Sequence, residues 1–206
     1  LTLNYSALAD TVKTSTVFIY NSVTEMLQLS VTYKDEVMID QANTLLFIQA
    51  YKGGATFGNL RKSLSNYSGE PGEEKIQWTR AFRSNGSVSS FTKFNYVNDV
   101  LHDSAATKYT AVGASYTSSV SNYTGFENEE KILETTAYRV STAVKSYTFY
   151  TYNAAMVLLR SDTWKDTDKV KRKSATLYTG QDEGEEKAKL TLNYSALADT
   201  VKTSTV

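Results

Sequence analysis

The sequence predicts an all-β fold of antiparallel sheets in a sandwich-like arrangement, and three observations predict it. Residues that favour strands are abundant, above all 15 tyrosines and many valines and threonines. A single proline occurs in 206 residues, which suits strands that use every backbone donor. Related segments recur along the chain, and their polar and apolar side chains alternate as in a strand. With 41% hydrophobic and 12% aromatic residues, the composition is globular.

The longest repeat is LTLNYSALADTVKTSTV, which occurs without a mismatch at Leu1–Val17 and again at Leu190–Val206. Internal repeats of this kind indicate a repetitive architecture. Tandem repetition, a recent gene duplication and an engineered addition would each produce such a match. We interpret the chain as one period that runs from Leu1 to Lys189 and then continues past its closure to Val206.

A shorter repeat divides that period into three. Glu-Glu-Lys triplets begin at Glu73, Glu129 and Glu185, which are equally spaced along the chain. They predict three related sub-repeats of about 56–77 residues with about four strands each. The expected divisions are 66–121 for the first sub-repeat, 122–176 for the second, 177–206 for the start of the third, and 1–65 for its remainder. That remainder carries an insertion, and its segment 1–17 is interpreted as a strand from a neighbouring period.

The expected strands follow from alternation and turn signals. Strands are predicted at 1–21 and around 27–31, whereas 35–50 fits a helix or a strand. Asn85-Gly86 is a hairpin signal that reverses the chain into a strand from Val88. Two weaker strands are expected within 101–120. The remaining predicted strands are 76–83, 132–140, 144–152, 156–164 and 170–177.

Three of these strands share the side chains on one face. From Val12, Val88 and Val144 onward, every second residue reads Val, Ser or Thr, Thr, Phe or Tyr, and Tyr. The opposite face differs among the three segments. Because a slip of one residue would move every side chain to the other face, we expect the shared face to pack against a common surface.

Composition and motifs argue against enzymatic chemistry. The chain has no cysteine and one histidine, His102, which lies beside Asp103 in a polar stretch. No catalytic triad, phosphate-binding loop or metalloprotease motif occurs, so we expect no enzyme. The net charge is zero, which argues against nucleic acid as a partner. No apolar run reaches the roughly 18 residues of a membrane span, so none is expected.

Acidic residues gather beside glycines in each of the three repeated turns. Clustered carboxylates on a turn are the ligands that Ca²⁺ prefers, although the spacing matches no defined calcium loop. The alternative is a solvated acidic turn that discourages unwanted edge pairing. Calcium is therefore a possible ligand, and no other cofactor is expected. The candidate ligands are Glu70, Glu73, Glu74, Glu127, Glu129, Glu130, Asp182, Glu185 and Glu186.

The duplicated stretch suggests a way to join units. Either copy can act as a strand that completes the sheet of an adjacent unit, as in strand addition. The hypothesis is a structural subunit or tandem-repeat unit of an extracellular filament, stalk or surface layer, with other copies as its partners. The residues expected on the shared strand are Val12, Thr14, Thr16, Leu190, Leu192, Tyr194 and Val201.

The alternative is a carbohydrate-binding or adhesive repeat module of a cell-surface protein, with glycans as partners. Aromatic residues favour it, although their repetition on one strand face also fits packing between strands. Five Asn-x-Ser/Thr sequons are candidate glycosylation sites of an extracellular protein: Asn4, Asn66, Asn85, Asn122 and Asn193. A basic cluster formed by Lys169, Lys171, Arg172 and Lys173 is expected to serve cross-strand charge pairing or edge protection.

Overall fold

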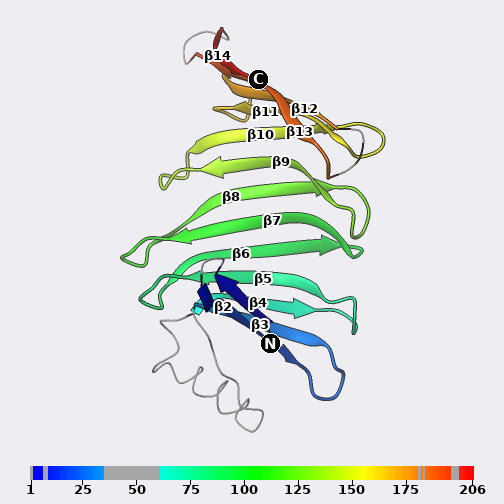
Figure 1. Ribbon diagram of the computed structural model, residues 1–206. Coiled ribbons are helices and arrows are strands. Elements are labelled where there is room, and N and C mark those ends of the chain that lie inside the picture. The colour runs from blue at the N-terminus through cyan, green and yellow to red at the C-terminus, as the bar shows by residue number, and fades with distance from the viewer. Residues whose placement is uncertain (1, 7–8, 35–60, 181, 183, 196–199) are drawn as a thin grey trace. The chain divides into compact units, whose positions relative to one another are not determined.

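The computed structural model describes residues 2–6, 9–34, 61–180, 182, 184–195 and 200–206. These residues form 14 β-strands and no helix. The strands are hydrogen-bonded in chain order from β1 to β14, so that each strand neighbours the next (Figure 1). The prediction of an all-β, antiparallel protein is confirmed. The structure shows a single open sheet and does not confirm the sandwich-like packing of two sheets. The helix-or-strand alternative at 35–50 lies outside the described residues.

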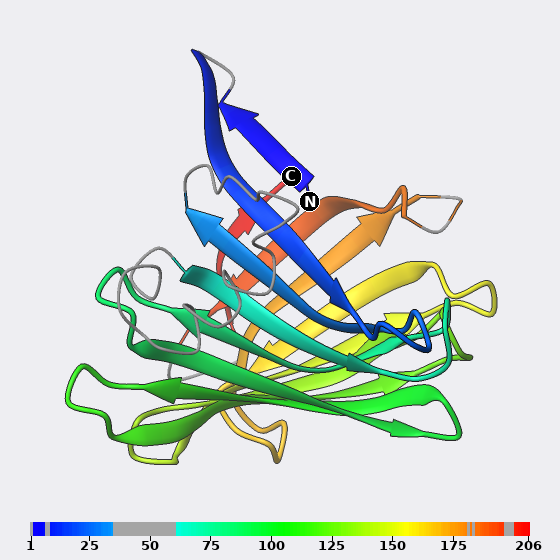
Figure 2. The same cartoon turned by 90° about the horizontal axis from the view of Figure 1, so that it is seen from below.

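The chain forms two compact units, which are described separately. The first comprises residues 1–93 and 108–114. Its strands are β1 (Thr2–Ser6), β2 (Ala9–Tyr20), β3 (Leu27–Lys34), β4 (Arg61–Ser68), β5 (Lys75–Phe82) and the first part of β6 (Val88–Val97). Figure 2 shows β2 and β3, in blue, running side by side in opposite directions.

The second unit comprises residues 94–107 and 115–206. It contains the rest of β6 and most of β7 (Val100–Tyr109). Its other strands are β8 (Ser115–Thr124), β9 (Lys131–Tyr138), β10 (Val144–Tyr152), β11 (Leu158–Trp164), β12 (Arg172–Thr179), β13 (Lys187–Tyr194) and β14 (Val201–Thr205). Four of these, β9 to β12, lie within two residues of the strands predicted from alternation.

The hairpin predicted at Asn85-Gly86 is confirmed. It joins β5 to β6, and Phe82 pairs with Val88 across the loop. The Arg83 N–H donates to the Ser87 carbonyl at 2.8 Å, and the Gly86 N–H donates to the Arg83 carbonyl at 3.0 Å. Gly86 has a φ of 79°, the left-handed conformation that the end of this hairpin loop requires.

A second hairpin, between β6 and β7, has a loop of only Asn98 and Asp99. Their φ angles are 50° and 66°. A two-residue type I′ turn needs positive φ at both central positions, and Asn and Asp tolerate this conformation better than other non-glycine residues. The strand expected within 101–120 therefore begins earlier, at Val100.

The register separates the side chains of the first unit onto two faces. Directly paired residues on one face include Ser30, Ser65 and Thr79, and we call it the hydroxyl face. The opposite face, here called the aromatic face, carries Val31 and, further along, Trp78. The buried residues of this face are Ser15, Val17, Val31 and Tyr33.

The second unit has the same division. Its hydroxyl face includes Thr148 of β10 and Ser161 of β11, whereas its aromatic face includes Tyr147 and Trp164, which pair directly. Tyr147, Trp164 and Ala175 are buried, as are Ser104, Ser161 and Asp162. The face predicted to be shared by repeated strands is thus the hydroxyl face, and Ser, Thr and Tyr side chains line it instead of a purely apolar core.

Candidate functional site

The duplicated stretch forms the same hairpin at both ends of the strand order. Four residue pairs of β1 and β2 recur in β13 and β14, and both hairpins shift register between the Asn and the Tyr of the first strand. The first hairpin pairs Thr2 with Thr16, Leu3 with Ser15, Asn4 with Thr14 and Tyr5 with Val12. The second pairs Thr191 with Thr205, Leu192 with Ser204, Asn193 with Thr203 and Tyr194 with Val201. The duplicated sequence therefore specifies one hairpin.

The second strand of the first hairpin, β2, is paired with β3. There Thr16 pairs with Thr32, and their hydroxyl oxygens lie 3.0 Å apart. Val17 pairs with Val31. At these positions β2 is buried, since Ser15 is 0% and Val17 3% exposed.

The second hairpin leaves its last strand at the sheet edge. Within the described part of the chain, β14 is hydrogen-bonded to β13 alone. All of Val201–Thr205 is exposed, and Val206 is 99% exposed. An edge strand presents a row of backbone N–H and C=O groups to which another strand can pair.

The residues predicted for a shared strand thus lie in two environments. The structure places Val12, Thr14 and Thr16 in β2, where Thr14 and Thr16 pair with both β1 and β3 and Val12 pairs with Tyr5 of β1. Leu190, Leu192 and Tyr194 lie in β13, which pairs with β12 and β14. Only Val201 lies on the open edge.

Three glutamates of the acidic turns cap the starts of distant strands. Glu74, Glu130 and Glu186 each stand at the start of a strand, and each carboxylate reaches past the adjacent strand to the second strand away. Their Oε1 atoms accept hydrogen bonds from the backbone N–H groups of Leu27 at 2.8 Å, Leu101 at 2.8 Å and Leu158 at 3.0 Å, respectively. The repeated triplet therefore fastens strands together in three places.

The second carboxylate oxygen holds the turn itself in two of these cases. The Gly72 N–H donates to Glu74 Oε2 at 3.0 Å, and the Gly184 N–H donates to Glu186 Oε2 at 2.8 Å. Hydrogen bonds to an ionised carboxylate favour the charged form. The bond from Leu27 is the largest cause of the lowered pKa of Glu74, and the bond from Leu158 is the largest cause of the lowered pKa of Glu186.

A glycine makes room for each of these turns. A Cβ atom on Gly69 would lie 2.8 Å from the Glu73 carbonyl oxygen, and one on Gly125 would lie 2.8 Å from the Glu129 carbonyl oxygen. Both glycines also have positive φ angles, 136° and 120°. A Cβ on Gly180 would lie 3.0 Å from the Glu186 Cα. Glycine is therefore needed where the acidic turn folds back on the strand.

The described residues do not bring the predicted calcium ligands together into a metal-binding cluster. In the residues that the structure describes, no three His, Asp or Glu side chains come together in a way that could hold a metal ion. Glu74, Glu130 and Glu186 instead accept backbone hydrogen bonds. The other candidates, Glu70, Glu73, Glu127, Glu129, Asp182 and Glu185, lie in the same three turns. Calcium binding stays a prediction.

A Ser–Tyr hydrogen bond also recurs three times on the hydroxyl face. It links neighbouring strands as Ser30–Tyr67 at 3.2 Å, Ser104–Tyr123 at 3.1 Å and Ser161–Tyr178 at 3.2 Å. Beside it, Ser or Thr hydroxyls pair across strands as Ser65–Thr79, Ser121–Thr135 and Thr176–Thr191, at 2.8–3.1 Å. Buried hydroxyls need partners, so these bonds allow polar side chains to lie within the sheet.

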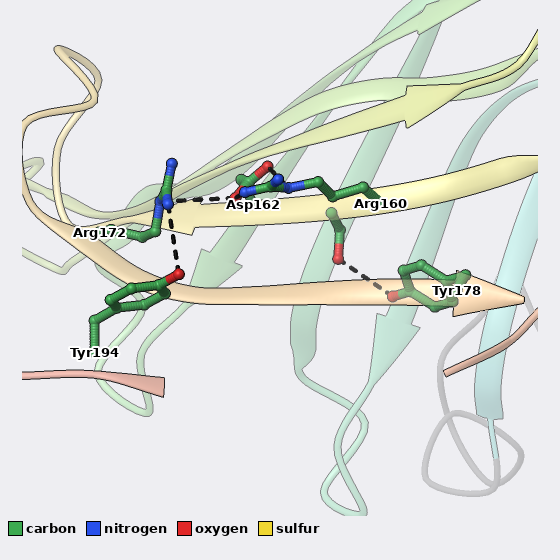
Figure 3. Close-up of polar contacts among 6 residues, drawn as sticks. Arg160, Asp162, Arg172, Tyr178 and Tyr194 are labelled. Atoms are coloured by element: carbon green, nitrogen blue, oxygen red, sulfur yellow. Dashed lines mark hydrogen bonds and ion pairs between the residues drawn. The ribbon is translucent and has the colours of Figure 1, made fainter. Parts of the chain in front are cut away.

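Asp162 is the centre of a charged cluster on the aromatic face of the second unit (Figure 3). It is 8% exposed. Arg160 forms two contacts with it, from Nη2 to Oδ1 at 2.7 Å and from Nε to Oδ2 at 2.6 Å, and these contacts raise the pKa of Arg160. Arg172 Nε lies 3.7 Å from Asp162 Oδ1, and Arg172 Nη1 donates to the Tyr194 hydroxyl at 3.4 Å. Arg172 therefore pairs across strands with Asp162 of β11, in line with the cross-strand pairing expected of the basic cluster.

Lys169 of the basic cluster lies over three aromatic rings. Its Nζ lies 4.9 Å from the ring centre of Phe149, 5.5 Å from that of Tyr147 and 5.7 Å from that of Trp164. The Tyr147 hydroxyl donates to Glu134 and is the largest cause of the lowered pKa of this carboxyl. Burial, followed by Glu134, raises the pKa of Tyr147 to about 12. The Lys169 ammonium group of the protein itself therefore makes cation–π contacts with these three rings.

The sequons lie in different surroundings. Asn4, Asn66, Asn122 and Asn193 are in β1, β4, β8 and β13, whereas Asn85 lies in the β5–β6 loop. The side-chain amide of Asn122 donates to Glu134 at 2.7 Å, and that of Asn193 donates to Thr203 at 3.2 Å. Asn66 donates to the Gln28 carbonyl at 3.3 Å. Asn85 is exposed and accepts hydrogen bonds from Ser87, so its loop position is the most suitable of these four for a glycan.

His102 is a surface residue. Its Nδ1 lies 3.0 Å from Asp103 Oδ2, and the His102 side chain is 63% exposed. Asp103 also accepts a hydrogen bond from Asn95 at 2.6 Å. In the part of the chain that the structure describes, no helix is both long and apolar enough to cross a membrane.

Comparisons with known proteins show only remote similarity. No protein-family model matches the chain. No curated protein matches it in sequence. A crystal structure of a protein of unknown function from Bacteroides fragilis is similar over 79% of this chain and 91% of that one, at 11% identity and a TM-score of 0.28. The structure of TcdB2-TccC3-TEV is similar over 87% of this chain but only 10% of that one, at 12% identity and a TM-score of 0.18.

Proposed function

We propose that this chain is a structural unit of an extracellular filament, stalk or surface layer, in which neighbouring units share a β-strand in a donor-strand-like joint. One observation carries the proposal. The duplicated sequence forms the same hairpin as the first and last strand pairs of the sheet, and its second strand is paired with β3 in the first copy but lies at the sheet edge, as β14, in the last. A sheet with matching ends and an open edge is suited to end-to-end extension.

Recurring contacts support a construction from three sub-repeats. The glutamate cap and the Ser–Tyr bond each occur three times, on successive groups of strands. The expected divisions at 66, 122 and 177 fall within β4, β8 and β12, the strands that carry the tyrosine of each Ser–Tyr bond. Stacked repeats gain stability from their neighbours, and added copies extend the same contacts.

The polar groups of the described region also favour a structural role over catalysis. Glu74, Glu134 and Glu186 have lowered pKa values because they accept hydrogen bonds from the protein itself. A general acid or base instead needs a pKa near the working pH and a free path to substrate. These lowered pKa values support the expectation of a structural role without catalysis.

Assembly of the full chain tests this function. Sedimentation velocity and electron microscopy should show end-to-end oligomers or filaments that grow with protein concentration. Charges on an edge strand block pairing, so Thr203→Lys together with Thr205→Lys should leave monomers. Ser84→Lys, on the exposed β5–β6 loop, is the matched control and should assemble as the unmodified chain does. A chain that stays monomeric at all concentrations would contradict the proposal.

A carbohydrate-binding or adhesive module of a cell surface is the second candidate. Trp78 and Phe91 favour it, because they lie 6.0 Å apart on the aromatic face with their rings tilted and partly exposed. Arg80 lies 4.9 Å from the centre of the Trp78 ring and 5.6 Å from that of Phe91, so a sugar must share or displace this cation. Tryptophan fluorescence during titration with glycans, or a glycan array, tests this function, and Trp78→Ala is the informative variant.

A further inference from the structure

We infer that the open edge of β14 binds β3 of a second copy of this chain, in the register in which β2 binds β3 within one copy. The inference rests on the proposed function and names its partner strand. It follows from a property of the two hairpins. The segment 201–205 of β14 is identical to the segment 12–16 of β2, and both strands have the same inner partner in the same register. The outer edge of β14 therefore presents the side chains and the backbone groups that β3 already recognises on β2.

The register of the joint can be read from the first hairpin. Thr14, Ser15, Thr16 and Val17 pair with Lys34, Tyr33, Thr32 and Val31. In the joint the corresponding pairs are Thr203 with Lys34, Ser204 with Tyr33, Thr205 with Thr32, and Val206 with Val31. Thr205 and Thr32 then repeat the hydroxyl contact that Thr16 and Thr32 make at 3.0 Å.

The side chains that the joint would cover are those that are buried in the first hairpin. Ser204 and Val206 are exposed, whereas the equivalent Ser15 and Val17 are buried under the neighbouring strand. In the joint Ser204 and Val206 take the positions that Ser15 and Val17 hold in one copy, and β3 exchanges one set of backbone partners for an identical one. The second copy is the occupant that the chain itself specifies, because β3 is the strand that covers this sequence elsewhere in the molecule.

The acceptor must release its own copy of the duplicated sequence. Because the incoming hairpin replaces an identical one, little net free energy is lost in the exchange, as in domain swapping. The acceptor keeps the pairs of Phe18 with Ser30 and Ile19 with Leu29, since these lie beyond the duplicated residues. Each junction then contains one hairpin, and a period consists of that hairpin and the strands from β3 to β12.

Disulfide trapping tests the register, because the natural chain has no cysteine. Full-length Thr32→Cys and Thr205→Cys chains are mixed under assembling conditions and oxidised. A disulfide between the two chains is expected on a non-reducing gel. Ser204→Cys mixed with Thr32→Cys is the matched control, since neighbouring residues of a strand point to opposite faces and this pair should not cross-link. Thr16→Cys with Thr32→Cys in one chain should cross-link internally and shows that the geometry permits the bond.

Hydrogen exchange on the unmodified chain provides a second readout that does not depend on the variants. The β14 amides should exchange about tenfold or more slowly in assemblies than in monomers, because pairing protects them. Assemblies that form without the Thr32–Thr205 disulfide, or with unprotected β14 amides, would overturn this inference and leave the proposed function intact. A chain that never assembles would overturn both.

Discussion

The two copies of the duplicated hairpin have one sequence and one register but different surroundings. In the first copy, Ser15 and Val17 are buried, and β3 pairs with β2. In the second copy, Ser204 is exposed and Val206 is 99% exposed, because β14 ends the sheet. The comparison separates two contributions. The pairing within a hairpin is a local property of its residues, whereas the burial of the hairpin depends on whether a further strand is supplied.

The largest difference between the copies should appear when a charge is placed at the equivalent valines. Val17→Asp buries an unpaired carboxylate and should lower the free energy of unfolding by about 3 kcal/mol or more. Val206→Asp places the same charge in water and should change it by less than about 0.5 kcal/mol. Urea unfolding of monomers measures both. Equal losses would mean that the two copies do not differ in burial.

The next largest effect concerns the turn that holds the start of β3. Gly69→Ala should destabilise the chain by about 2 kcal/mol, because its φ of 136° is strained for alanine and its Cβ would meet the Glu73 carbonyl. Gly180→Ala, in the turn that precedes β13, should cost less because its closest contact is 3.0 Å. Thermal unfolding followed by circular dichroism compares them. A larger loss for Gly180→Ala would show that the positive φ of Gly69 is not the main cost.

A smaller effect is expected from the hydroxyl contact between β2 and β3. Thr16→Val removes the bond to Thr32 and should cost about 1 kcal/mol in the monomer. Thr205→Val is the matched change in the second copy and should be nearly neutral in the monomer, but it should weaken assembly if β14 binds β3. Urea unfolding measures the stability of the monomer, and sedimentation equilibrium measures the strength of assembly. A Thr205→Val chain that is destabilised as a monomer would contradict the edge position of β14.

The smallest expected effect is a local dependence on pH. Glu74 and Glu186 have pKa values below the ordinary 4.5, so their hydrogen bonds contribute stability above that pH and lose it as the pH falls through the lowered values. The protection factors of the Leu27 and Leu158 amides, which correct for intrinsic exchange, should therefore fall several-fold on acidification below 4.5. Hydrogen exchange followed by nuclear magnetic resonance measures this dependence.

Two variants separate the roles of adjacent glutamates. Glu74→Gln should abolish the acid dependence at Leu27, because the carboxylate is the acceptor there. Glu73→Gln, an exposed neighbour in the same turn, should preserve it. If the Leu27 amide kept its acid dependence in Glu74→Gln, another group would be its partner.

Local signals were sufficient for much of the fold. The strands from β9 to β12 follow the alternation of their side chains, and the β5–β6 hairpin follows from Asn85-Gly86. The spacing of Glu73, Glu129 and Glu185 also located the three turns that cap distant strands. What the spacing did not reveal is the acceptor role of the next residue in each triplet. Glu74 binds the amide of Leu27, far away in the chain, and the local pattern around a carboxylate does not contain such a partner.

The grouping of strands was also beyond the local pattern. Alternation at Val144–Tyr152 states which residues share a face but not whether a second sheet covers that face. The charged pair of Asp162 with Arg172 likewise depends on the register of β11 against β12. A sandwich was therefore as compatible with the alternation as the open sheet that the structure shows.

The sequence by itself determined that this chain forms strands and where several of them turn, because these depend on residues close together in the chain. The structure showed that LTLNYSALADTVKTSTV, expected as strand over 1–21 and as a strand from a neighbouring period, pairs with itself as a hairpin in both copies. Only the tertiary structure decided which copy of that hairpin is buried and which is open. The reason is that the third strand of a sheet comes from elsewhere in the chain. The strand next to Val17 is β3, whereas the described residues supply no further strand next to Val206.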